Sequence, residues 1–174
     1  LLTERESNWD KKIDLKFSWI KPLPGWYKLN IDGTFNKNDA NGGIGGIFRN
    51  RNGDWILGFT SKIISRTLIN SELMALYQGL CIAKDRKLFP LEIESDATHV
   101  ITFIKEGCKA YESIINSCRM LLSQMDTMMM HHNFRQGNEA AHILVKHARD
   151  FSAFNKIELL FLPPPFVMNR MLAD

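Results

Sequence analysis

Residues 28–64 read KLNIDGTFNKNDANGGIGGIFRNRNGDWILGFTSKII, and this stretch decides the fold. Leu29 and Ile31 alternate with polar residues, which is typical of a strand with one apolar face. A glycine-rich run with interleaved isoleucines follows, and the Asn-Gly pair at 52–53 is a strong hairpin signal before the β-rich run 55–64. The stretch therefore predicts three consecutive antiparallel strands.

The rest of the chain predicts helices that alternate with strands. From Asn70 the apolar period becomes helical and lasts until Pro90, and residues 91–96 then form a short strand. Two further helical stretches precede a strand at 127–135, and a last helix opens at Asn138. Helices between strands imply parallel crossovers added to the antiparallel strands. We therefore predict an α/β fold with a five-stranded mixed sheet, three antiparallel strands plus two parallel ones, flanked by helices.

Length and composition favour one globular domain. The chain has 174 residues, of which 45% are apolar and 24% charged, close to globular averages. We expect residues 1–18 to be an N-terminal arm or linker, 19–150 to be the domain, and 151–174 to be a C-terminal tail that packs on the domain or extends from it. The net charge of +3 permits nucleic-acid binding without requiring it, because no run of five like charges occurs.

Cysteine usage and the lack of long apolar runs bear on the compartment. Cys81, Cys108 and Cys118 are odd in number and form no C-x-x-C pair, which disfavours a disulfide scaffold. No apolar run approaches about 18 residues, and acidic residues stand where a signal peptide would need basic ones. We expect an intracellular protein, nuclear or cytoplasmic, with no membrane partner. The chain starts with Leu1, which is compatible with a piece of a longer protein.

Three acids stand where a simple core or surface role does not explain them. Asp32 ends the first predicted strand, Asp96 ends the fourth, and Glu72 lies on the inward stripe of the first helix. An inward acid costs free energy unless it is paired or binds a cation, and converging carboxylates suit Mg²⁺ or Mn²⁺. Taken singly, each acid also fits an ordinary role, such as a turn at Asp32 or a first-turn acid favoured by the helix dipole at Glu72.

Five motifs together resemble the ribonuclease H-like domain of plants, a family that occurs alone and at the ends of non-LTR retrotransposon polyproteins. The resemblance covers about residues 19–150 and consists, in order, of KLNIDGT (28–34), GGIGGIFR (42–49), SELMAL (71–76), ESD (94–96) and RQGNEAA (135–141). It implies the ribonuclease H-like fold and the hydrolysis of the RNA strand of an RNA/DNA hybrid.

The resemblance also implies two divalent ions, with Asp32, Glu72 and Asp96 matching three of the family's acids. Two such ions can activate a water and stabilise the leaving 3′ oxygen. The fourth acid is missing, because His142 stands where the family carries an aspartate. A neutral imidazole suits Mn²⁺ better than Mg²⁺, and the first turn of a helix disfavours the imidazolium. We therefore expect His142 to be a catalytic, metal-ligating residue, with Mn²⁺ favoured and the activity weakened.

Cations and amides near the expected site are candidates for nucleic-acid contact. They are Arg49, Asn50 and Arg51 at the hairpin, and Arg135 and Asn138 before the last helix. For the hairpin residues and for Arg135, a solvated turn is the alternative interpretation.

Two other interpretations of the same domain stay open. One is a catalytically inactive nucleic-acid-binding or protein-interaction module, and the other is a remnant retroelement domain without selected activity. The three acids favour the enzyme, whereas His142 favours the rivals. Another histidine, His99, is assigned to a surface or capping position.

Overall fold

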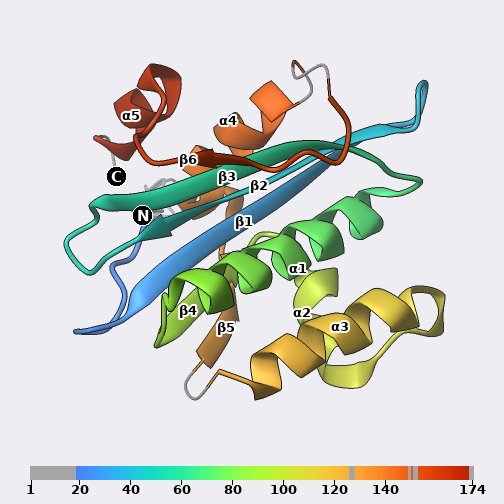
Figure 1. Cartoon of the computed structure of the whole chain (residues 1–174), viewed down its shortest axis with the longest axis horizontal. Coiled ribbons are helices and arrows are strands. Elements are labelled where there is room, and N and C mark those ends of the chain that lie inside the picture. The colour runs from blue at the N-terminus through green and yellow to red at the C-terminus, as the bar shows by residue number, and fades with distance from the viewer. Residues whose placement is uncertain (1–18, 126–127, 149, 151–152, 173–174) are drawn as a thin grey trace, which may run out of the picture.

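The described part of the chain is built on one six-stranded mixed sheet with the order β5-β4-β1-β2-β3-β6 (Figure 1). The computed structural model describes residues 19–125, 128–148, 150 and 153–172, so the predicted arm at 1–18 lies outside the described residues. The strands are β1 (Tyr27–Asn36), β2 (Asn41–Arg49), β3 (Trp55–Ile64), β4 (Leu91–Ser95), β5 (Met128–His132) and β6 (Glu158–Leu160). The helices are α1 (Leu68–Arg86), α2 (Thr98–Glu106), α3 (Glu112–Ser123), α4 (Glu139–Ala148) and α5 (Pro165–Met171), with the short 3₁₀ helices η1 (Lys109–Tyr111) and η2 (Arg135–Asn138).

The predicted antiparallel strands and parallel crossovers both form. β1 pairs with β2 and β2 with β3 in antiparallel fashion, and the β2–β3 turn contains Gly53 at φ 91°, a conformation that glycine adopts without strain. β4 pairs in parallel with β1, and β5 in parallel with β4. The α/β class and the mixed sheet expected from the sequence are thus confirmed.

The predicted count of five strands is wrong, because a sixth strand forms within the region predicted as a tail. β6 pairs antiparallel with β3 at Gly58, Phe59 and Thr60. The chain after β6 continues into α5, where Val167 is fully buried in a cluster with Ile47. The segment from β6 to α5 therefore covers the edge of the sheet at β3 and packs on the same face of the sheet as α4.

Helices cover both faces of the sheet (Figure 1). The helices α1, α2 and α3 lie on one face over the larger apolar core, to which β1 contributes Leu29 and Ile31. On the other face, α4 and α5 enclose a smaller core around Ile47. No described helix is both long and apolar enough to cross a membrane. All three cysteines are free, as expected.

The polar side of β1 is buried as well. Lys28 and Asn30 have no exposed surface, and the Lys28 ammonium pairs with Glu92 and Glu94 of β4. Asn30 donates to Glu94 at 3.0 Å and accepts from the Trp19 indole at 3.0 Å. Because every one of these polar groups has a partner, the network tolerates burial and ties β1 to β4 beside the candidate site.

Candidate active site

The register between β1 and β4 brings Asp32 and Asp96 together. The two strands run parallel with Ile31 opposite Ser95, so the next residue on each chain is an aspartate. Asp32 lies inside β1 and does not end the strand as predicted, because β1 continues to Asn36 along β2. β4 does end at Ser95, so residues 32–36 of β1 have no partner in β4.

A glycine lets the third acid reach this place from α1. A Cβ at Gly33 would lie 2.6 Å from the backbone nitrogen of Glu72 and from the carbonyl carbon of Ser71, distances too short for any side chain. Gly33 therefore allows the first turns of α1 to touch β1, and Glu72 projects toward Asp32. The sequence carried a signal for this role, since a glycine inside a strand marks a close approach of backbone.

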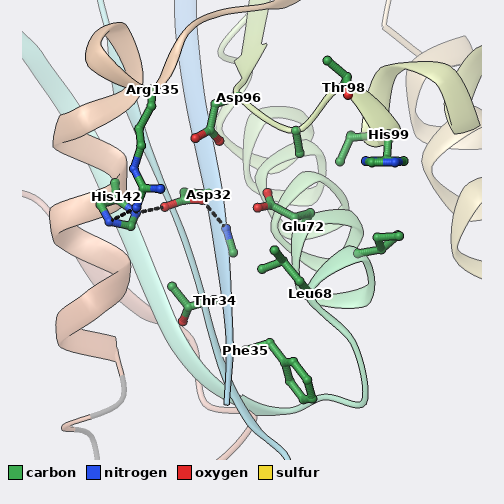
Figure 2. Close-up of a pocket in the computed structure, with 14 residues that line it drawn as sticks. Asp32, Thr34, Phe35, Leu68, Glu72, Asp96, Thr98, His99, Arg135 and His142 are labelled. Carbon is green, nitrogen blue, oxygen red and sulfur yellow. Dashed lines mark hydrogen bonds and ion pairs between the residues drawn. The ribbon is translucent and has the colours of Figure 1, made fainter. Parts of the chain in front are cut away.

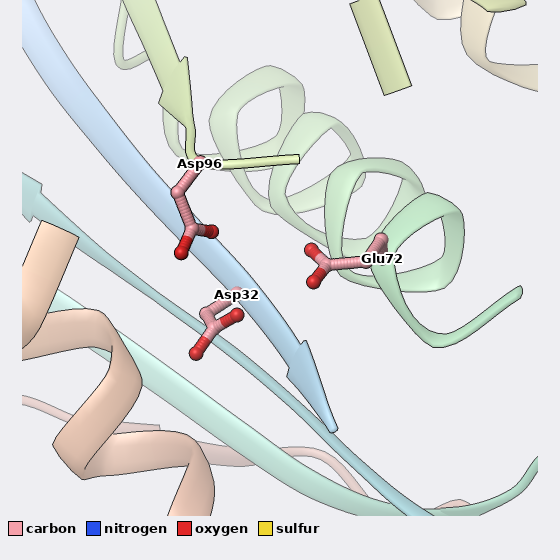
Figure 3. Close-up of side chains that lie close together, drawn as sticks. All are labelled: Asp32, Glu72 and Asp96. Atoms are coloured by element: carbon pink, nitrogen blue, oxygen red, sulfur yellow. The ribbon is translucent and has the colours of Figure 1, made fainter. Parts of the chain in front are cut away.

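The three carboxylates form one cluster (Figure 3). One oxygen from each of Asp32, Glu72 and Asp96 lies within 4.8 Å of the other two. Asp32 and Glu72 are buried, at 3% and 5% exposure, and Asp96 is half-buried. Burial, followed by the charges of Asp32 and Asp96, raises the pKa of Glu72 to about 10. Burial and then Asp32 also raise the pKa of Asp96. The cluster is under electrostatic strain that a cation would relieve.

The cluster fits a divalent metal ion. Glu72 Oε2 is buried without a hydrogen-bond partner among the described residues, although buried carboxylate oxygens are normally paired. All three groups offer the oxygen ligands that Mg²⁺ and Mn²⁺ prefer. The carboxylates line a pocket of about 490 Å³ that is open enough to admit a substrate group (Figure 2).

His142 lies beside the cluster but is not part of it. Its Nδ1 is 2.7 Å from Asp32 Oδ2, and its Nε2 is 2.6 Å from Arg135 Nη2. Arginine can only donate, so Nε2 accepts and Nδ1–H donates to the carboxylate, which is the pattern of a neutral ring. Because both ring nitrogens have protein partners, this arrangement does not match the ligand role predicted for His142.

The predicted nucleic-acid contacts at the hairpin are not near the site. In the β1–β2 register, Arg49 lies opposite Lys28, whereas Gly45 lies opposite Asp32. Arg49 is therefore four residues along the sheet from Asp32, a separation of about 13 Å at ~3.3 Å per residue. The Arg49 side chain is 1% exposed, stacks on Trp19 and donates to Asn30, so the predicted surface role is wrong and Arg49 belongs to the buried polar network.

Asn50 and Arg51 are used locally in the turn. Asn50 Oδ1 accepts from the backbone nitrogens of Asn52 and Asp54, and Arg51 donates to the carbonyl of Pro22. These contacts belong to the turn itself, for which a solvated turn was the alternative interpretation, and both residues lie at the end of the sheet away from the carboxylates.

The second group of predicted contacts does lie at the site. Arg135 is exposed and lines the pocket. Asn138 donates to the carbonyl of Ile31 at 2.8 Å and lies 3.5 Å from Asp96 Oδ1, so it fastens η2 to β1. Asn138 is only 1% exposed, which is too little for the predicted nucleic-acid contact. His99, which was assigned to a surface or capping position, is exposed and lines the pocket as well.

Comparison with known proteins places this geometry in context. The family described as "Reverse transcriptase-like" matches residues 30–148. The Arabidopsis thaliana protein named "Putative ribonuclease H protein At1g65750" is 26% identical over 167 residues, which are 94% of this chain and 26% of that protein. The chain thus spans about a quarter of the length of this relative.

Solved structures share the fold. RNase H1 from the halophilic archaeon Halobacterium salinarum NRC-1 has a TM-score of 0.65 and 22% identity, covering 72% of this chain and 98% of that one. LC11-RNase H1, isolated from compost by a metagenomic approach, was solved with an RNA/DNA hybrid and has a TM-score of 0.63 and 19% identity, covering 71% of this chain and 96% of that one. At these identities the likeness shows the fold, and the chemistry has to come from the site itself.

Proposed function

We propose that this chain, which belongs to the reverse transcriptase-like family and has the fold of the ribonuclease H enzymes, hydrolyses the RNA strand of RNA/DNA hybrids with divalent cations as cofactors. The observation that carries the proposal is the cluster of Asp32, Glu72 and Asp96, three carboxylates within 4.8 Å of one another at the wall of an open pocket. Acidic groups whose pKa values are raised by burial and by one another are characteristic of functional sites in a cleft.

The three carboxylates would hold the cation, and the site needs no nucleophilic side chain. A bound divalent cation lowers the pKa of water and stabilises negative charge on phosphate oxygens. Glu72 has to give up its proton for that purpose, which its raised pKa makes unfavourable until the cation arrives. Asn138 and Gly33 keep the ligands in place, because the first fastens η2 to β1 and the second lets α1 approach it.

Substrate recognition fits a hybrid duplex. The pocket is lined by Arg135 and by the neutral polar side chains of Thr34 and Thr98, which suit contact with phosphate and with a 2′-hydroxyl. Such contacts read shape rather than base edges, so binding will be largely independent of sequence. The relative solved with an RNA/DNA hybrid supports this class of substrate.

A cleavage assay tests the proposal. End-labelled RNA/DNA hybrid is incubated with the chain and either Mg²⁺ or Mn²⁺, beside single-stranded RNA and duplex DNA of the same sequence. We expect cleavage of RNA in the hybrid alone, and none by the Asp96→Asn variant. Tight hybrid binding without cleavage under either ion would favour the inactive binding module instead.

A further inference from the structure

Asp32 lies between two unlike neighbours. Figure 2 shows Glu72 on one side of its carboxylate and His142 on the other. Both oxygens already accept a hydrogen bond, Oδ1 from the backbone nitrogen of Gly33 at 2.9 Å and Oδ2 from His142 Nδ1 at 2.7 Å. Each carboxylate oxygen can accept a second contact, so the side of Asp32 that faces Glu72 and Asp96 can still ligate a cation, whereas the opposite side is covered by the imidazole ring.

A permanent positive charge stands on the covered side. Arg135 projects from η2, lines the same pocket as the carboxylates and donates to His142 Nε2 at 2.6 Å. A guanidinium stays charged at physiological pH and well above it. Its charge also reaches Asp96, where it opposes the rise in pKa caused by burial and by Asp32. His142 thus links a fixed cation to the ligand cluster through its two ring nitrogens.

The partners of Asp32 then limit the number of metal ions. Asp32, Glu72 and Asp96 offer one set of three oxygens within 4.8 Å of one another, which is one place for a cation. On the other side of Asp32, His142 occupies Oδ2 and Arg135 lies behind it. A second divalent ion would create an excess of positive charge beside the guanidinium and would have to displace His142 from Asp32 Oδ2.

We infer that the site binds a single divalent cation through Asp32, Glu72 and Asp96, and that Arg135, oriented by His142, is the second positive group for the substrate phosphate. His142 is then a positioning residue, in contrast to the two-ion site with a histidine ligand expected from the sequence. The part played by the phosphate rests on the proposed function, but the number of ions does not. A planar, charged donor such as Arg135 suits a phosphodiester oxygen, which it can bind through two nitrogens.

Metal stoichiometry tests this inference without substrate. The metal-free chain is titrated with Mn²⁺, and the electron paramagnetic resonance signal of unbound Mn²⁺ gives the number of ions held per chain. We expect one ion for the wild type and two for His142→Asp, which replaces the covering ring by a fourth carboxylate. His142→Asn, which can still donate to Asp32, should bind one ion. His147→Asp makes the same change on the exposed end of α4 and should also bind one.

Two ions on the wild type, or a single ion on a folded His142→Asp variant, would overturn the inference. Failure of the proposed function gives a different result, namely the expected ion counts with no cleavage of the hybrid. Arg135 is tested by cleavage: Arg135→Ala should lower kcat at least tenfold and Arg135→Lys should restore part of it, with one Mn²⁺ bound in the lysine variant. An unchanged kcat in Arg135→Ala would remove Arg135 from the phosphate site.

Discussion

Replacement of Glu72 by glutamine should stabilise the metal-free protein at neutral pH while it weakens metal binding. Burial and the neighbouring acids raise the pKa of Glu72 to about 10 from the ordinary value of 4.5. Between these two pH values the folded chain keeps a proton that the unfolded chain has lost. The unfolded state binds fewer protons, so the stability contributed by this group falls as pH rises through the window.

The magnitude follows from the width of that window. Each pH unit between 4.5 and 10 lowers the free energy of unfolding by about 1.4 kcal/mol through this group, so the loss from pH 5 to pH 8 is about 4 kcal/mol. Glutamine resembles the protonated acid in shape and has no proton to lose in this range. The stability difference between Glu72→Gln and wild type should therefore grow with pH by that amount. Asp96, whose pKa is also raised, is present in both proteins and cancels.

Urea unfolding with EDTA at pH 5, 6.5 and 8 measures the difference in free energy of unfolding between Glu72→Gln and wild type. When the experiment is repeated with Mn²⁺, we expect this difference to change sign. Wild type should gain stability from Mn²⁺, because the cation binds the folded state and replaces the Glu72 proton, whereas the variant should gain much less. Glu106→Gln, at an exposed position on α2, is the matched control and should keep the wild-type pH slope. Equal pH slopes for Glu72→Gln and wild type would refute the electrostatic account of the cluster.

Other substitutions probe the site and the sheet separately. Asp96→Asn should abolish cleavage with Mg²⁺ and with Mn²⁺ while circular dichroism shows an unchanged fold, since Asp96 is only half-buried. Gly33→Ala should lower the free energy of unfolding by about 1–3 kcal/mol in urea, because its Cβ would press on the backbone of α1. Arg49→Ala should cost about 2 kcal/mol or more, because it removes a buried cation that stacks on Trp19, whereas the exposed Arg51→Ala should stay within about 0.5 kcal/mol. Reduced hybrid affinity in Arg49→Ala without loss of stability would return this residue to the nucleic-acid surface.

The parts of the fold that the sequence predicted are those with a strong local period. Leu29 and Ile31 alternate with buried polar residues, and the Asn-Gly pair at 52–53 sits in the β2–β3 turn, so the three-stranded meander could be predicted. β6 could not, because Glu158–Leu160 is too short for a period and pairs only because the edge of β3 is available to it. The length of β1 was missed for a similar reason, since the segment after Asp32 is held by its partner β2.

The same distinction explains what could be predicted of the site. An acid on the inward, apolar stripe of a helix costs free energy unless it is paired or binds a cation. Glu72 could therefore be predicted as a site residue from its own helix alone. The role of a cation or an imidazole depends on which partners the fold brings to it, and those partners are distant in sequence. Arg49 donates to Asn30, which is 19 residues away in the sequence, and His142 contacts Asp32, which is 110 residues away. His142 was therefore recognised as the place where the site departs from its family, but its use as a donor to Asp32 and an acceptor from Arg135 becomes visible only when β1, η2 and α4 meet.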